Sequence, residues 1–555
     1  MKCVAVLLLT VLAAVRANDP VVRTAQGQLR GSVLRTVDGR DIFSFRGVPF
    51  AKPPVGDLRF KAPVPVESWD GIRNATEDGF ACPQRWGSFG TRSEDCLFLN
   101  VYTTKLDVTT PRPVVVFFHP GGYFSVSGNS IWAGPNYLLD EDIVVVTANY
   151  RLGALGFLSL RDANLPGNYA MKDQVQVLRW VQENIAAFGG DAGSVTLAGY
   201  SAGAFSVILH MVSPMSQGLF HRAMAMSGSP LVEMVAGRPE DQARKQATLL
   251  NCTAEPVEEM VNCLRQKEAR DFIGTFLSFR EFANDPMLVF GPVVEPDLGD
   301  GTERFLTADP QELLLAGNFT KVPLMIGHTT MEFHWKGLQI LQNSNWTEEM
   351  NSDFERIAPI SFLYERGTEK SRRITAGLRK YYLKDQPITN ASATGLGQLY
   401  SDSIIIFPVH RAAKLISAKN TAPVYFYKFS YAGRYSYVYD PLDSQRTYGV
   451  VHHDDLLYLF YNPTGSFKLF TPQDEEFPTM KKMIKIWSNF MKEGNPTPER
   501  TSLLSNVTWE PYTADNLKYL DIGSTLSMKE GLYSERIATW ERLFPLPHTT
   551  NVKKG

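Results

Sequence analysis

The stretch SVTLAGYSAGAFSVILHMV, residues 194–212, decides the fold. Its first half is β-branched and apolar and predicts a buried strand, whereas Val207, Ile208 and Met211 repeat at the spacing of one helix face. The G-x-S-x-G pattern between them places Ser201 in a tight turn that pushes its hydroxyl out at the end of the sheet. On this interpretation Ser201 is a nucleophile. The alternative is a serine in an ordinary packing turn.

Neighbouring segments extend the same pattern. β-Branched runs that suit strands buried on both faces alternate with a helix-length segment, MKDQVQVLRWVQENIAAF, whose apolar residues repeat at helical spacing. The runs are PVVVFF from Pro113, DIVVVTANY from Asp142 and VPLMIG from Val322. The order strand, helix, strand predicts the α/β class with a mostly parallel sheet.

The chain of 555 residues shows no internal repeat, low-complexity tract or long linker, so we expect one domain over residues 18–555. Residues 1–17 join a lysine to an apolar run that is too short to span a bilayer, and they end in a small-residue cleavage site. They predict a secretory signal peptide, with an uncleaved anchor as the alternative. We therefore expect a secreted, extracellular protein that has no membrane anchor.

Charge and cysteine content fit that compartment. Lys+Arg 56 nearly balances Asp+Glu 58, which argues against binding to nucleic acid or an anionic membrane and favours a neutral small-molecule partner. The cysteines beyond the leader form two sequence-local pairs that an exported chain would oxidise, with buried thiols as the alternative. Sequons predict exposed, glycosylated positions at Asn74, Asn251, Asn318, Asn345, Asn390 and Asn506.

A nucleophilic serine needs a base and an acid, which follow it in the order nucleophile, acid, base in this type of sheet. Glu332 is the only carboxylate in HTTMEF, the loop after the strand VPLMIG. The later loop GVVHHDDLLYLF holds His452 and His453, either of which could be the base. His328 and His334 flank Glu332 and are weaker alternatives.

The negative charge that develops on an attacked carbonyl also needs hydrogen-bond donors. The run VVVFFHPGGYF, residues 114–124, ends a predicted strand in a Gly-Gly turn. The amides of Gly121 and Gly122 could join that of Ala202 as an oxyanion hole. An ordinary turn at a strand end is the alternative.

Together the motifs FRGVPFAKPPVGDLRF, SEDCLFLNVY, HPGGY, NYRLGALGF, FGGDAGSVTLAGYSAGA, MSGS, GPVVEPD and GVVHHDDL resemble the type-B carboxylesterase/cholinesterase family. They run in order from about Val22 to Phe544, and Pro120 in HPGGY is similar to exported arthropod carboxylesterases. The resemblance implies an α/β-hydrolase fold, with a large, mostly parallel central sheet flanked by helices and long insertions that form a substrate gorge.

The resemblance also implies roles for individual residues. It implies a catalytic triad of Ser201, Glu332 and His452, supported by Ser227. The implied oxyanion hole consists of Gly121, Gly122 and Ala202. The implied disulfides are Cys82–Cys96 and Cys252–Cys263. The implied structural ion pairs are Arg46–Glu94 and Arg151–Asp173.

Three positions depart from the family pattern. Tyr200 stands where many members carry Glu, and His453 stands where a small residue is usual, so we interpret His453 as a packing or lining residue. Trp86 resembles the choline-binding tryptophan of cholinesterases but lies in a shorter loop, and an ordinary loop aromatic is the preferred interpretation. These departures argue against acetylcholine as substrate.

We therefore predict a serine carboxylic ester hydrolase that works through an acyl-enzyme, needs no metal or cofactor, and cleaves neutral, fairly apolar esters of hormone, odorant, pheromone or xenobiotic type. Activity should decline in acid as an imidazole of pKa ~6.5 is protonated. One alternative is a non-catalytic adhesion or ligand-binding protein. Another is the same triad acting on lipid esters, thioesters or amides.

Overall fold

The structure is a computed structural model that describes residues 19–85, 90–234, 237–440, 443–463, 467–513 and 515–547, with main chain alone for residue 440 and residues 443–447. The predicted signal peptide and Trp86 lie outside the described residues.

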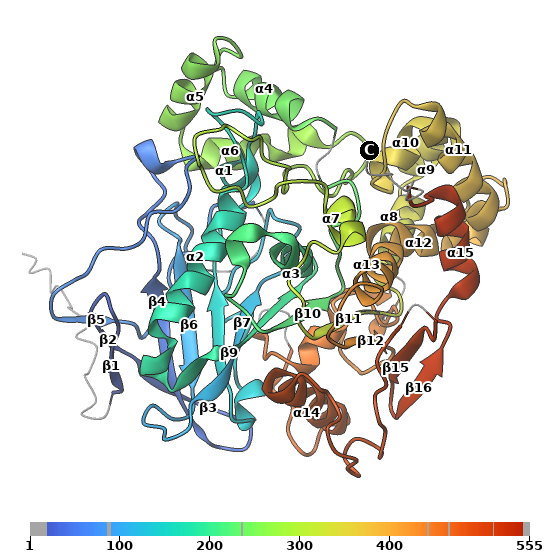
Figure 1. Cartoon of the computed structure of the whole chain (residues 1–555). Coiled ribbons are helices and arrows are strands. Elements are labelled where there is room, and N and C mark those ends of the chain that lie inside the picture. Colours follow the sequence, from blue (N-terminus) through green and yellow to red (C-terminus); the bar gives the residue numbers. More distant parts are fainter. Residues whose placement is uncertain are drawn as a thin grey trace, which may run out of the picture.

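An 11-stranded sheet runs through the molecule in the order β16-β15-β12-β11-β10-β9-β7-β8-β6-β4-β3 (Figure 1). Its central strands, from β15 to β8 in that order, run parallel, and the outer strands are antiparallel. The strands are β3 Ser32–Arg35, β4 Asp41–Pro49, β6 Phe98–Thr103, β7 Arg112–Phe118, β8 Val144–Ala148, β9 Gly190–Tyr200, β10 Arg222–Met226, β11 Leu324–Thr329, β12 Val424–Phe429, β15 Lys518–Ile522 and β16 Leu526–Glu530. The predicted α/β class with a mostly parallel sheet is confirmed.

Two smaller sheets lie outside the central one. A three-stranded sheet joins β1 Val21–Arg23, β2 Gln28–Arg30 and β5 Ile72–Asn74, and a two-stranded sheet joins β13 Tyr439–Asp440 and β14 Asp443–Thr447.

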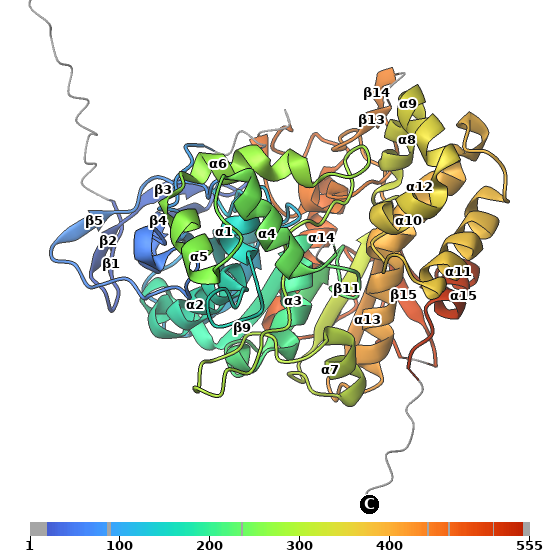
Figure 2. The ribbon, with the colours of Figure 1, turned by 90° about the horizontal axis from the view of Figure 1, so that it is seen from above.

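Helices cover both faces of the central sheet, and Figure 2 shows α2, α3 and α13 along one side of it. Figure 1 shows two further groups toward the top of the view, α4 to α6 and α9 to α11. The α-helices are α1 Gly153–Phe157, α2 Tyr169–Asn184, α3 Ala202–Val212, α4 Pro239–Leu249, α5 Val257–Gln266, α6 Ala269–Thr275, α7 Pro310–Ala316, α8 His334–Gln342, α9 Ser344–Ser352, α10 Phe354–Ser361, α11 Glu369–Leu378, α12 Ala393–Ser401, α13 Phe407–Ser417, α14 Phe477–Glu493 and α15 Ser534–Leu543.

Alternation along the strands divides the core into two. In β7, Val114 and Val116 face one apolar cluster while Val115 and Phe117 face the other, because successive side chains in a strand point to opposite faces. Apolar residues of α2, α3 and α13 complete the first cluster, and those of α14 complete the second. The continuous β-branched runs in the sequence reflect this burial on both faces.

Strand β9 is longer than the predicted strand of residues 194–198. It spans Gly190–Tyr200 because it pairs with β7 on one side and with β10 on the other, where Tyr200 lies opposite Met226. Pairing on both edges therefore carries the strand up to the residue before Ser201.

The structure contains two disulfides, at the positions that the family resemblance implies. It also contains the implied ion pair between Arg151 and Asp173, with Nη2 and Oδ1 2.7 Å apart and both side chains buried. The disulfides are Cys82–Cys96 and Cys252–Cys263.

The predicted pair between Arg46 and Glu94 is wrong. Glu94 instead binds Arg59, whose guanidinium also donates to main-chain carbonyls at the end of α5 and is fixed there. Arg46 Nη1 lies 3.6 Å from Asp78 Oδ2. Arg46 on β4 and Arg59 after the first short helix therefore pair with different carboxylates.

Two features of the described surface concern membrane contact and glycosylation. Among the described residues, no helix combines the length and the apolar character needed to cross a membrane. The six sequon asparagines are all exposed: Asn74, Asn251, Asn318, Asn345, Asn390 and Asn506.

Candidate active site

Ser201 occupies the turn between β9 and α3, as the motif predicts. Its φ of 54° and ψ of −120° are unusual for a residue other than glycine and mark a strained turn. The Ser201 amide donates to the carbonyl of Met226 on β10 at 2.9 Å, which fixes the turn to the sheet. The side chain is 7% exposed and lines a cavity of about 390 Å³.

The two glycines of the motif are required by close packing of the main chain. A Cβ atom on Gly199 would lie 2.2 Å from the carbonyl oxygen of Gly203, and one on Gly203 would lie 2.1 Å from that of Phe118. No real Cβ atom is tolerated at such distances, so strand β7, the turn and helix α3 can approach only with glycine at both positions.

Glu332 and His452 come together from loops that are far apart in the sequence. Glu332 lies in the turn after β11, and His452 lies just before the short helix η9, Asp454–Tyr458. His452 Nδ1 is 2.5 Å from Glu332 Oε2, and the His452 amide donates to the Glu332 carbonyl oxygen at 3.2 Å. These two contacts fix the ring relative to the carboxylate.

The second oxygen of Glu332 is also bound. Ser227 Oγ and the Thr329 amide each donate to Oε1 at 2.7 Å. The carboxylate is completely buried, and burial raises its pKa, while the donated hydrogen bonds and the nearby His328 oppose the rise. Ser227 thus lies where the family resemblance puts it.

His452 is held in a form suited to a base. Burial lowers the pKa of His452, so the ring is neutral at physiological pH. With Nδ1 directed at Glu332, Nε2 is left as the proton acceptor, and among the described residues it has no hydrogen-bond partner. His452 lines the same cavity as Ser201.

The Gly-Gly turn forms another part of the cavity wall. Gly121 and Gly122 have φ of 111° and 57°, and their amides donate no hydrogen bond to any residue that the structure describes. Ala202 begins α3 directly after Ser201, so its amide has no acceptor within the helix. These three amides are therefore free for a ligand oxygen.

The other histidines considered as the base are placed differently. His328 Nδ1 contacts the Thr329 carbonyl oxygen at 2.8 Å, and its Nε2 lies 3.3 Å from His410 Nε2. His334 begins α8, where it is 5% exposed and does not line the cavity. His453 does line the cavity, and its ring packs edge-on against Trp132.

A support for the histidine loop was not predicted. Tyr200 is completely buried, its ring centroid is 5.1 Å from that of His452, and its hydroxyl accepts the His453 amide at 2.9 Å. Nearby, Tyr427 donates to Asp455 Oδ2 at 3.2 Å. Asp455 was visible in GVVHHDDL, but nothing in the sequence connected it with Tyr427, or Tyr200 with the histidine loop.

Most of the cavity wall was also missed, because nothing in the sequence shows which side chains of these loops and of α8 face the cavity. Besides the residues already described, the wall contains aromatic, aliphatic and polar side chains. They are Phe124, Ser125, Val126, Arg280, Asn284, Met287, Phe333, Trp335, Lys336 and Gln339. Among the described residues, no group of three or more His, Cys, Asp or Glu side chains is placed to hold a metal ion.

The family model described as carboxylesterase family matches residues 18–540. This chain belongs to the carboxylesterase family. That membership brings with it the α/β-hydrolase fold that the motifs predicted and the activity of a carboxylic ester hydrolase on small-molecule esters.

Carboxylesterases from insects are among the similar proteins. The juvenile hormone esterase of Tribolium castaneum is 37% identical over 89% of this chain and 86% of its own length. Esterase FE4 of Myzus persicae is 39% identical over 91% of this chain and 90% of its own. The crystal structure of juvenile hormone esterase from Manduca sexta, with OTFP covalently attached, superposes with a TM-score of 0.85 at 31% identity and covers 95% of this chain and 100% of that one.

Proposed function

We propose that Ser201 is the nucleophile of this carboxylesterase and that hydrolysis passes through an acyl-enzyme. His452 Nε2 removes the hydroxyl proton as the oxygen attacks the ester carbonyl, and the amides of Gly121, Gly122 and Ala202 stabilise the oxyanion. The protonated imidazole then gives its proton to the departing alcohol. Water repeats the attack on the acyl group and regenerates the serine.

One observation carries this proposal: the serine hydroxyl and a histidine nitrogen without a partner line the same cavity, while the other nitrogen of that histidine binds a buried carboxylate. Glu332 holds the ring in the tautomer that leaves Nε2 unprotonated, and its charge stabilises the imidazolium that forms during the reaction. Ser227 holds Glu332 in turn.

The proposed substrates are largely apolar esters of hormone, odorant, pheromone or xenobiotic type. Phe124, Met287, Phe333 and Trp335 give the cavity apolar walls that would hold a hydrocarbon chain. A known insect relative is named for a hormone ester, which supports this class.

We also propose that the single domain is secreted after removal of residues 1–17 and that it carries glycans. The leader sequence supports export, and the exposure of all six sequon asparagines supports glycosylation.

Labelling with a fluorophosphonate probe, together with turnover of 4-nitrophenyl acetate, tests the nucleophile. Ser201→Ala should lose the label and at least about three decades of kcat/KM, because the attacking oxygen is gone. The matched control is Ser488→Ala: Ser488 is a buried serine on α14 whose hydroxyl donates to the Lys485 carbonyl oxygen. This control should keep both label and turnover. A Ser201→Ala protein that is still labelled would refute the assignment.

A further inference from the structure

Arg280 places a positive charge in the wall of the proposed active-site cavity. It follows the short helix η5, Phe276–Phe279, and its side chain lines the cavity. The guanidinium lies 5.7 Å from the ring centroid of Phe124 and 4.9 Å from that of Phe276. Its Nη1 donates to main-chain carbonyl oxygens of the loop 284–286. The group is therefore held in place by rings and neutral acceptors.

The charge of Arg280 is not neutralised locally. In the described part of the chain, no carboxylate lies within salt-bridge distance of it, and no aspartate or glutamate lines the cavity. The nearby Asp285 is already bound to Lys336 Nζ at 2.7 Å and to the Tyr400 hydroxyl at 3.0 Å. Lys336, the second cation of the wall, is thereby neutralised, and the wall keeps one net positive charge.

Arg280 also retains the means to bind an anion. Among the described residues its Nη2 donates no hydrogen bond, and the buried Nε beside it has no partner either. Burial lowers the pKa of Arg280 to about 10, so the group is still cationic at neutral pH. Aromatic neighbours lower the local dielectric constant, which strengthens the attraction for a negative charge in the cavity.

We propose that Arg280 makes this enzyme select esters that carry a carboxylate or another anionic group at a distance from the scissile bond. This proposal rests on the proposed function, since it assumes that the ester binds in the cavity of Ser201. It replaces the neutral substrate class expected from the balanced net charge: the preferred ester keeps the apolar body but carries an anionic end. An ester with a quaternary ammonium group is disfavoured by the same charge.

Two series of ester probes test this selection, because the anion could lie on either side of the scissile bond. The acyl series is 4-nitrophenyl hydrogen adipate, 4-nitrophenyl heptanoate and 4-nitrophenyl 6-(trimethylammonio)hexanoate. The alcohol series is 4-acetoxybenzoate, 4-acetoxybenzamide and 4-acetoxyphenyltrimethylammonium. Each series thus contains an anionic, a neutral and a cationic ester of similar size. The measured quantity is kcat/KM relative to the neutral member, so a general loss of activity divides out.

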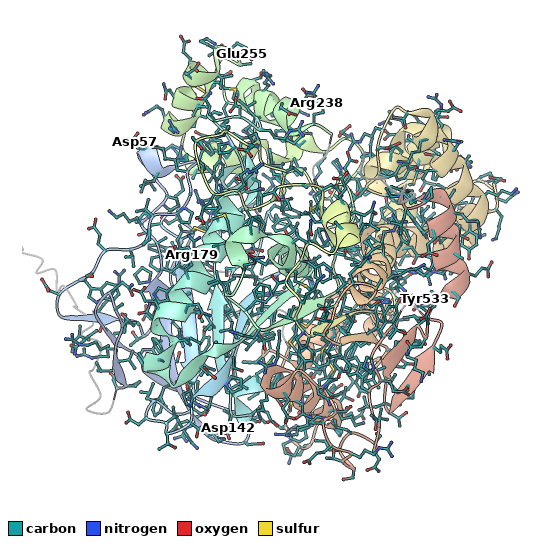
Figure 3. The ribbon with its side chains drawn as sticks, in the orientation of Figure 1. Asp57, Asp142, Arg179, Arg238, Glu255 and Tyr533 are labelled. Carbon is teal, nitrogen blue, oxygen red and sulfur yellow. A yellow bond between two sulfur atoms is a disulfide. The ribbon has the colours of Figure 1, made fainter. Side chains whose placement is uncertain are left out.

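The variants are Arg280→Met, which keeps length without charge, and Arg280→Lys, which keeps the charge. In at least one series, Arg280→Met should lower the anionic-to-neutral ratio about tenfold, which corresponds to roughly 1.4 kcal/mol, and should raise the cationic-to-neutral ratio. Arg280→Lys should retain most of the preference. The control is Arg179→Met: Arg179 lies on α2 (Figure 3). Its side chain is 43% exposed, and its Nη2 lies 3.1 Å from Glu303 Oε2. This variant removes the same charge elsewhere and should leave the ratios unchanged.

Ratios that change less than about twofold in both series for Arg280→Met would overturn the proposal. So would an equal change in Arg179→Met, because the effect would then come from net charge alone. Failure of the proposed function gives a different result: the Ser201→Ala protein would still be labelled by the fluorophosphonate and would still hydrolyse the neutral esters.

Discussion

Two of the histidines considered as the base, His452 and His328, differ in how many of their ring nitrogens are bound. His452 and His328 are both buried, and burial lowers the pKa of each ring. His328 uses both nitrogens, one on the Thr329 carbonyl oxygen and one on His410. His452 binds Glu332 through Nδ1, and among the described residues its Nε2 has no partner, while the residue lines the cavity. Closeness to a carboxylate therefore does not distinguish the two rings; an unpartnered nitrogen on a cavity-lining residue does, and it makes His452 the proposed base.

The largest expected effect comes from exchanging each histidine for glutamine. His452→Gln should lower kcat by about four to six decades, because no other group can take the serine proton. His328→Gln should lower kcat less than about tenfold, since its ring contacts Thr329 and His410 and does not line the cavity. Steady-state hydrolysis of 4-nitrophenyl acetate measures both, and thermal unfolding shows whether each variant is folded. A folded His328→Gln protein as inactive as His452→Gln would break the comparison.

The next effect concerns the carboxylate between the two histidines. Glu332→Gln should lower kcat about four decades, because a neutral amide no longer fixes the tautomer or stabilises the imidazolium. Ser227→Ala removes only one donor to Glu332 and should cost about fivefold, equivalent to one lost hydrogen bond of ~1 kcal/mol. Single-turnover acylation rates compare the two. Equal losses would mean that Glu332 acts only as a structural residue.

The pH profile sharpens the role of burial. An imidazole of ordinary pKa ~6.5 would lose about thirtyfold in activity between pH 8 and pH 5. Because burial lowers the pKa of His452, the neutral base persists to lower pH, and we expect a smaller loss in kcat/KM over this range. The decline in activity that the sequence predicted is thus expected at a lower pH. A loss of thirtyfold or more in folded enzyme would contradict this.

Acid should also lower the stability of the folded protein. His119 and His210 are buried with pKa values lowered to about 4 and about 3, so below ~6.5 the unfolded chain binds more protons than the folded one. Their contribution to stability is complete above that pH and is lost as the pH falls toward the folded values. Tryptophan fluorescence at each pH separates unfolding from protonation of His452.

The parts of the site that the sequence predicted are those fixed by local geometry or by chain order. Gly199 and Gly203 admit no side chain, and their pattern between a predicted strand and a predicted helix located Ser201. Glu332 and His452 follow predicted strands, and the ends of parallel strands meet at one edge of the sheet. The strands themselves were predicted from continuous apolar runs in the sequence.

The parts that were missed depend on long-range packing. Arg280 follows a short helix and Trp335 lies on α8, and no sequence pattern connects the two segments, so their convergence is visible only in three dimensions. The error at Arg46 has the same origin: its partner is Asp78, a carboxylate 32 residues away that only the folded chain brings close. Charge partners on loops are fixed by the fold as a whole.

The smallest expected effect tests how the free nitrogen of His452 is kept in position. Tyr200→Phe removes the acceptor of the buried His453 amide, which loosens the loop and should lower kcat about fivefold, an effect of ~1 kcal/mol, with little change in KM. The matched control is Tyr427→Phe, which removes a tyrosine hydroxyl that binds only the Asp455 side chain and should cost less than about twofold. If both variants lose activity equally, the effect comes from the buried polar cluster as a whole and Tyr200 does not position the histidine. A larger loss of kcat in Tyr200→Phe that neither a higher substrate concentration nor a lower temperature restores has a different meaning. It shows that the hydrogen bond from the His453 amide to Tyr200 orients the loop that carries the proposed base.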